Sequence, residues 1–203
     1  MRLTLLFIFI PFLLQSAVSL DDSESYLGYV IMAGDTLYVK FELPYSNIKQ
    51  GPKQEKIQLG VKYYEQDELI LLLPNEADEI GIYLKKDTLR FVSRYSNLKL
   101  GGRKDGETGL PKIFLRLEIE GDLTLYTAWF KIPDPEGGSW SGLPVLQRKG
   151  DILFKPPKLG FRKAMIAYLG ECSGIDVALP KKEYNIKNAD QLVEYYNMAC
   201  AFK

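Results

Sequence analysis

Apolar and polar residues alternate with a period of two along much of the chain, a pattern typical of half-buried β-strands. The alternation is clear in residues 36–43, which follow the apolar run 29–33. Gly34 and Asp35 lie between these segments and predict a tight turn, so we expect a hairpin. One face of the second strand carries Leu37, Val39, Phe41 and Leu43.

The pattern predicts further strands downstream. Residues 57–63 alternate and are interpreted as another half-buried strand. The continuous apolar run 69–73 is short enough to be a fully buried strand. Residues 80–84 and 88–95 then predict a second hairpin, closed by a turn at Asp87.

The longest hairpin is predicted over residues 112–130, around Gly121 and Asp122. A loop of three residues and a loop of two residues both fit the pattern. The two-residue loop pairs Leu117 with Tyr126, whereas the three-residue loop shifts the second strand by one position. The sequence leaves both registers open.

A segment rich in proline and glycine, residues 133–144, is interpreted as a loop that carries Trp140. Exposed aromatic residues on loops often contact ligands or sugar rings, so Trp140 is a candidate binding residue. The alternative is that Trp140 folds back as a plug over the sheet edge. Residues 145–148 and 152–154 follow as a last short hairpin.

The period changes after Pro157. Residues 161–169 predict a short helix, and Asn188 with Gln191 resembles a capping box that opens another. Two short helices cannot form a core alone, so they should pack against the sheet. We therefore predict an α+β fold. It has a mainly antiparallel β domain of about ten strands at residues 20–157, a sandwich or partly open barrel, and a helical segment at residues 158–203.

A pseudo-repeat relates residues 27–51 to residues 80–101. Each copy holds a glycine in an apolar run and then an Asp-Thr-Leu sequence, and each ends in Tyr-Ser-Asn with a lysine two positions later. Matching order and near-matching spacing favour duplication or two hairpins under one structural constraint. We expect the two hairpins to occupy related positions in the β domain.

The N-terminus resembles a secretory signal. Arg2 precedes the apolar run 3–14, and small residues at positions 17 and 19 predict cleavage after Ser19. The mature chain should then be secreted or periplasmic, with no membrane span. An uncleaved anchor is the alternative.

Charge and cysteine content narrow the function classes. The 26 basic residues balance the 26 acidic residues, so the chain offers no general attraction to nucleic acid or anionic lipid. In an exported protein, Cys172 and Cys200 favour a disulfide, which should stabilise the fold by about 3–4 kcal/mol. Two buried free thiols are the alternative.

The chain has no histidine, which excludes imidazole-activated nucleophiles and zinc sites with histidine ligands. Two Ser-x-x-Lys sequences begin at Ser46 and Ser96, but the other elements of lysine-activated serine enzymes are missing. We expect both serines to hydrogen-bond their own loop backbone. No catalytic, cofactor or metal site is predicted.

Paired carboxylates can hydrolyse glycans without histidine. Glu118 and Glu120 on the long hairpin are candidates, as are the acidic residues Glu76, Asp78 and Glu79. Carboxylates that alternate with apolar residues are also typical of a solvated sheet face, so binding or plain solvation competes with catalysis.

The chain contains the short motifs Gly28-Tyr29-Val30-Ile31, Asp78-Glu79-Ile80-Gly81, Glu120-Gly121-Asp122-Leu123 and Tyr195-Tyr196-Asn197 before Cys200. In these motifs and their order it resembles an uncharacterised family of secreted proteins common in Bacteroidetes bacteria. The family has no assigned activity, so the resemblance implies an exported bacterial protein and no catalysis. Many relatives have proline after the acidic residue and cysteine, where this chain has Ser173.

The sequence thus predicts an exported, non-catalytic binding or envelope-associated protein, with Trp140, Glu118 and Glu120 as candidate ligand contacts. Its partner would be a glycan or an envelope protein. The alternatives are a carboxylate-dependent glycan hydrolase and a structural subunit that assembles through an open sheet edge.

Overall fold

The computed structural model describes residues 23–46, 51–102, 104, 106–133, 138–170, 172 and 185–200. The predicted signal segment and its cleavage site lie outside the described residues. Within them the chain forms ten antiparallel strands in one open sheet, with short helices, which confirms the predicted fold class. The sheet order is β10-β9-β8-β7-β6-β1-β2-β4-β5, and β3 pairs with β2.

The strand bounds are β1 (Ser23–Met32), β2 (Asp35–Ser46), β3 (Gly51–Pro52), β4 (Val61–Glu65), β5 (Glu68–Leu72), β6 (Glu79–Tyr83), β7 (Thr88–Tyr95), β8 (Lys112–Ile119), β9 (Leu123–Ile132) and β10 (Ser139–Arg148). The helices are α1 (Gln54–Ile57), α2 (Phe161–Tyr168), the 3-10 turn η1 (Ile186–Asn188) and α4 (Ala189–Ala199).

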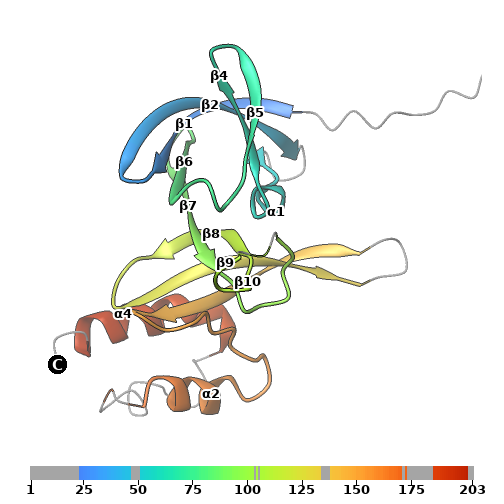
Figure 1. The fold of residues 1–203 in the computed structure, drawn as a ribbon. Helices are drawn as coiled ribbons and strands as arrows, with labels where there is room; N and C mark the ends of the chain where they lie inside the picture. Colours follow the sequence, from blue (N-terminus) through green and yellow to red (C-terminus); the bar gives the residue numbers. More distant parts are fainter. Residues whose placement is uncertain are drawn as a thin grey trace, which may run out of the picture.

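The sheet bends so strongly that it forms two connected halves (Figure 1). Strands β1, β2, β4, β5 and β6 make the upper half, and β8, β9 and β10 make the lower half, with β7 running between them. The upper half curls around a core that includes Phe41, Phe91 and Trp129. Helices α2 and α4 cover the lower half, where Met165 and Leu192 pack with Leu125.

Both copies of the pseudo-repeat form hairpins, and these lie side by side because β1 pairs with β6. Their loops differ: Ala33 and Gly34 close the first, both at positive φ, whereas residues 84–87 close the second. In the pairing between the copies, Gly81 lies opposite Tyr29, the neighbour of Gly28. Because adjacent residues face opposite sides of a sheet, the aligned Gly28 and Gly81 lie on opposite faces.

Two predicted strands were wrong in part. Residues 57–60 complete α1 and a turn, so the half-buried strand begins only at Val61. Gly60 has a positive φ that a regular strand does not allow. The run 69–73 is also not fully buried, because β5 is the last strand of the sheet and Leu71 remains 54% exposed. An apolar run cannot distinguish an edge strand from a central one.

The predicted loop 133–144 was wrong in its second half, since β10 begins at Ser139 and pairs with β9 along its whole length. Trp140 is therefore a strand residue opposite Lys131, not a loop residue. The predicted hairpin that follows is reduced to one bridge, in which Leu146 and Phe154 exchange two backbone hydrogen bonds.

The long hairpin adopts the register in which Leu117 pairs with Tyr126. The register then shifts, and Ile119 pairs with Leu125, so Glu118 forms a β-bulge. Neither regular alternative holds over the whole hairpin, because the bulge inserts one residue into β8.

Gln58 completes the sheet where β8 and β9 separate. Its side-chain carbonyl accepts the Trp129 N–H at 2.8 Å, and its side-chain amide donates to the Trp129 carbonyl at 3.1 Å. Its own backbone carbonyl accepts the Phe114 N–H at 3.0 Å. Gln58 is fully buried between the two strands. This one residue therefore satisfies backbone groups of both β8 and β9.

Asn197 of α4 plays the same part at the other end of β9. Its side-chain carbonyl accepts the Leu123 N–H and its amide donates to the Leu123 carbonyl, both at 2.9 Å.

The predicted Cys172–Cys200 disulfide is present and ties the end of α4 to the segment after α2. The predicted capping box is wrong: Asn188 takes the N-cap position of α4 without a side-chain cap hydrogen bond, and the Asn185 side chain accepts the Lys187 N–H in η1 instead.

The variant Gln58→Met keeps the length of the side chain but removes both polar groups. It should lower the free energy of unfolding by about 2–4 kcal/mol, because it leaves the buried N–H and carbonyl of Trp129 unpaired. Chemical denaturation measures the loss. The matched change Gln191→Met, at an exposed position of α4, should alter stability by less than about 0.5 kcal/mol. Equal effects of the two changes would contradict the role of Gln58.

Candidate functional site

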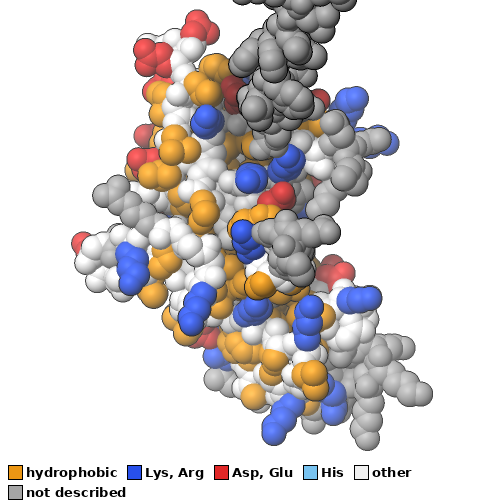
Figure 2. Space-filling view, turned by 90° about the vertical axis from the view of Figure 1, so that its right-hand side faces the viewer, with side chains coloured by type: hydrophobic (Ala, Val, Ile, Leu, Met, Phe, Trp, Pro, Cys, Tyr) orange, Lys and Arg blue, Asp and Glu red, His pale blue; other side chains and the backbone are white. Residues whose placement is uncertain are grey.

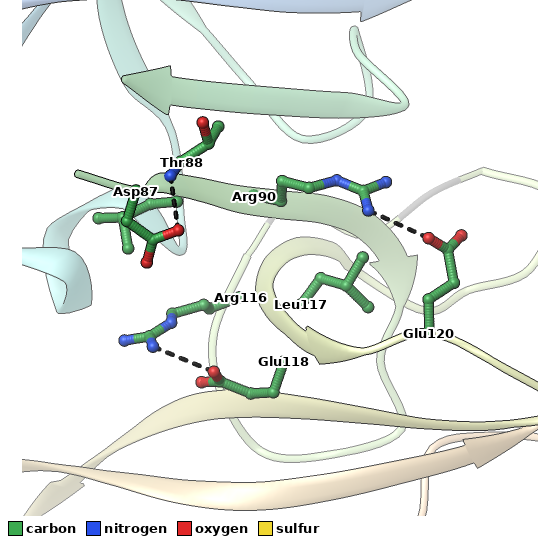
Figure 3. A pocket seen from close by; sticks show the side chains of 8 residues that line it. Asp87, Thr88, Arg90, Arg116, Leu117, Glu118 and Glu120 are labelled. Carbon is green, nitrogen blue, oxygen red and sulfur yellow. Dashed lines mark hydrogen bonds and ion pairs between the residues drawn. The ribbon is translucent and has the colours of Figure 1, made fainter. Parts of the chain in front are cut away.

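The candidate site is a cavity of about 230 Å³ between β7 and β8, which we call the fork cavity. The two strands pair as far as Phe91 and Arg116 and then diverge. Figure 3 shows side chains of both strands pointing into the space between them. The lining residues are Asp87, Thr88, Leu89, Arg90, Arg116, Leu117, Glu118 and Glu120.

Arg90 links two carboxylates at this site. Its guanidinium binds Glu79 in a bidentate pair, with Nε at 2.8 Å from Oε1 and Nη2 at 2.9 Å from Oε2. Its Nη1 donates to Glu120 Oε2 at 3.1 Å. The Tyr29 hydroxyl also donates to Glu79, at 2.6 Å. The chain of contacts therefore crosses β1, β6, β7 and the end of β8, and it fixes the orientation of Arg90.

Arg116 anchors the opposite wall. Its Nη2 donates to Glu118 Oε2 at 3.0 Å, and its Nη1 donates to the side-chain carbonyl of Gln54 at 2.9 Å. The Thr127 hydroxyl donates to the other Glu118 oxygen at 2.6 Å. Both carboxylate oxygens of Glu118 are thus acceptors, and Glu118 lies at the bulge of β8.

Glu79, Tyr29 and Arg90 keep their protonation states at neutral pH. Burial alone would raise the pKa of Glu79, but hydrogen bonds from Arg90 and Tyr29 and the charge of Arg90 outweigh it and hold that pKa below its usual range. Burial, followed by the hydrogen bond to Glu79, raises the pKa of Tyr29 to about 12. The hydrogen bond to Glu79 is the main cause that raises the pKa of Arg90. Glu79 is therefore ionised, and its two donors remain protonated.

The Tyr29 ring lies against Gly81, which pairs with it across β1 and β6. A Cβ atom on Gly81 would overlap the ring. Glycine at this position therefore lets the tyrosine lean across the neighbouring strand and reach Glu79.

The structure brings two of the three predicted site residues together. Glu118 and Glu120 both line the fork cavity, each with an arginine partner. Trp140 lies on the edge strand β10, 38% exposed, and is not among the residues that line this cavity. It also belongs to none of the core clusters of the described residues.

The acidic cluster before β6 divides into separate roles. Asp78 accepts the Ala33 N–H at 3.1 Å and Glu76 accepts the Leu73 N–H at 2.7 Å, so both carboxylates stabilise turns. Only Glu79 joins the network beside the cavity. Ser96 hydrogen-bonds the Leu98 N–H at 3.1 Å, as predicted for a loop serine. The Ser-x-x-Lys sequence at Ser46 lies partly outside the described residues.

Sequence analysis missed Arg90 and Arg116 as site residues. Both stand in strands with otherwise apolar neighbours, which is a weak signal that the guanidinium must find a partner. The partners themselves depend on which strands adjoin, and Arg90 lies thirty positions from Glu120 in the chain. A strand pattern does not contain that information.

The described residues form neither a metal site nor a membrane-spanning helix. The described residues contain no group of three or more Cys, Asp or Glu side chains placed to hold a metal ion. In the part of the chain that the structure describes, no helix has the length and apolar character needed to cross a membrane. Figure 2 shows Lys and Arg side chains scattered over one face rather than gathered in one patch.

Comparison of the chain with protein-family models, curated proteins and solved structures finds no match in any of the three.

Gly81→Ala should destabilise the protein by about 1–3 kcal/mol, because the new methyl group displaces the Tyr29 ring and breaks its hydrogen bond to Glu79. The matched change Gly106→Ala meets no atom within 4 Å and should be nearly neutral. In a Tyr29→Ala background, Gly81→Ala should cost far less, which thermal unfolding of the double variant would test. An undiminished cost in that background would contradict the proposed clash.

Arg90→Gln should lower the free energy of unfolding by about 1–3 kcal/mol near pH 7, because the largely buried Glu79 carboxylate loses its charged partner. The pKa of Glu79 is lower in the folded state than in the unfolded state. The pair's contribution is therefore complete above the unfolded pKa and is lost as the pH falls through the folded pKa.

The difference in free energy of unfolding between the unchanged protein and Arg90→Gln should accordingly narrow as the pH drops below about 4. Denaturant titrations at several pH values across this range measure that difference. Arg90→Lys keeps the charge but not the planar pair of donors, so it should restore only part of the loss. A gap that is independent of pH would show that Glu79 is not the group responsible.

Proposed function

We propose that this protein is an exported, non-catalytic binding protein that holds a neutral, hydroxyl-rich ligand, a glycan unit, in the fork cavity. The observation that carries the proposal is the pairing of each guanidinium in the cavity with a carboxylate. Paired in this way, the charged groups become fixed hydrogen-bonding groups of known direction.

The chemistry of the lining favours hydroxyl groups over charged ligands. Arg90 and Arg116 keep N–H groups beyond those used in the contacts described above, since a guanidinium has five. Asp87, Glu118 and Glu120 add acceptors to the same wall. Three carboxylates against two guanidinium groups disfavour an anion, and vicinal hydroxyls can donate to a carboxylate while accepting from a guanidinium.

The same contacts argue against hydrolysis. A glycan hydrolase needs one carboxyl group that carries a proton and a second that acts as base or nucleophile. Both oxygens of Glu118 already accept hydrogen bonds, from Arg116 and Thr127, and Arg90 donates to Glu120, so both candidate carboxylates are engaged as acceptors within the protein. Binding without turnover is therefore the function that the geometry supports best.

The proposed location outside the cytoplasm has separate support. The N-terminal signal pattern and the resemblance to secreted Bacteroidetes proteins both favour export. A disulfide between Cys172 and Cys200 fits an oxidising compartment. An exported bacterial protein meets glycans of the envelope and of the surroundings.

Glu118→Gln should weaken binding of a neutral sugar by about 10- to 100-fold, since one charged acceptor is lost and Arg116 loses its carboxylate partner. The measurement is titration calorimetry with a sugar selected from an array of immobilised glycans. Glu65→Gln removes an exposed carboxylate at the end of β4 and should leave the affinity unchanged.

The bound sugar should be recovered intact after prolonged incubation. Release of reducing ends that Glu118→Gln abolishes would instead favour the glycan hydrolase. Binding that neither variant affects would place the ligand elsewhere on the molecule.

A further inference from the structure

A second hollow of about 340 Å³ adjoins the fork cavity on the outer face of β1, β2 and β6. We call it the tyrosine shelf, and its aromatic residues are Tyr29, Tyr38 and Tyr83. Tyr38 is 75% exposed and Tyr83 is 42% exposed, so both present ring surface to the solvent. The shelf also includes Glu79 and Arg90, which carry opposite charges in one ion pair.

Tyr29 is the ring of the shelf that its neighbours hold in place. Tyr29 lies directly opposite Tyr38 in the β1–β2 pairing. The Tyr29 ring rests on Gly81 and its hydroxyl is tied to Glu79, so it does not rotate freely. The Tyr83 ring stands 6.0 Å from the Tyr29 ring at an interplanar angle of 53°. The result is a shallow, open hollow whose lining carries three tyrosine side chains.

Arg90 joins the shelf to the fork cavity. It lines both hollows, and its contacts reach Glu79 on the shelf side and Glu120 on the cavity side. The two hollows are therefore neighbouring subsites that share one guanidinium. A ligand that fills both must be elongated, with a polar edge that passes Arg90.

We propose that the tyrosine shelf is a second sugar-binding subsite, so that the natural ligand is a chain of at least two pyranose units. This inference rests on the proposed function and adds the ligand class to it. A pyranose ring has an apolar face of C–H groups, which stacks on an aromatic ring, and an edge of hydroxyl groups. On the shelf, the apolar face of the sugar stacks on Tyr38 or Tyr83, and its hydroxyl edge hydrogen-bonds to Glu79 and Arg90.

The neutrality of the shelf supports a sugar over a charged partner. Glu79 and Arg90 cancel each other's charge, and the remaining lining residues named for the shelf are uncharged. Tyr29 stays protonated at physiological pH, because burial and the Glu79 carboxylate raise its pKa to about 12. The shelf therefore offers hydrogen bonds and ring surface, and the further carboxylate of Glu120 on Arg90 disfavours an anionic ligand.

The experiment compares binding to an array of glycans that runs from single sugars to short oligomers, including neutral hexoses, N-acetylhexosamines and uronic acids. The intact protein should bind neutral oligomers more tightly than the matching single sugar. Tyr38→Ala should weaken oligomer binding by roughly 2- to 10-fold, the size of one aromatic contact, and leave single-sugar binding unchanged.

Tyr95→Ala is the matched control. Tyr95 is a half-exposed tyrosine on β7 that contacts Lys112 and lines neither hollow. Its loss should leave the affinity for oligomers unchanged.

The outcomes separate the two proposals. If single sugars bind as tightly as oligomers and Tyr38→Ala has no effect, the shelf inference is wrong, whereas the proposed binding in the fork cavity is retained. If no glycan binds, the proposed function fails and the shelf inference fails with it. Oligomer binding that Tyr38→Ala and Tyr95→Ala reduce equally also contradicts the shelf.

Discussion

The structure depends on how β9 satisfies its backbone where β8 no longer pairs with it. Buried N–H and carbonyl groups need partners, and an open fork in a sheet would leave them without any. Gln58 supplies these partners at Trp129, and Asn197 supplies them at Leu123. Because Gln58 precedes β4 and Asn197 belongs to α4, these two amides join the upper half of the sheet and the C-terminal helix to one strand. Both amides therefore satisfy backbone groups of β9 that β8 does not reach.

The candidate site follows from the same bend. Where β8 turns away from β7 after the Phe91–Arg116 pair, side chains rather than backbone groups fill the opening. Charged side chains in such a space require partners of opposite sign. Arg90 and Arg116 find these on β6 and β8, and the resulting network leaves an ordered, solvent-accessible wall.

The sequence predicted the local structure well and the long-range structure poorly. The alternating residues, the turn residues near Gly34 and Asp87, and the change of period after Pro157 each identified an element that the structure contains. The errors at residues 57–60 and at Trp140 arose because tertiary contacts decided the local conformation: Gln58 must enter the fork, and β10 follows β9 as far as Ser139. Glu118 and Glu120 were identified from alternation alone. Their arginine partners were not, since those depend on strand order.

Ion pairing in the fork cavity is consistent with recognition of an uncharged ligand. An unpaired guanidinium would attract anions and counterions and would have to release them before a sugar could bind. A guanidinium held by Glu79 or Glu118 has no such requirement, and its remaining N–H groups already point in fixed directions. Binding then costs little side-chain entropy at the arginines, because the protein has ordered them beforehand. Weak contacts to hydroxyl groups can accumulate along an elongated ligand, which makes the neighbouring Tyr38 and Tyr83 the natural continuation of the site.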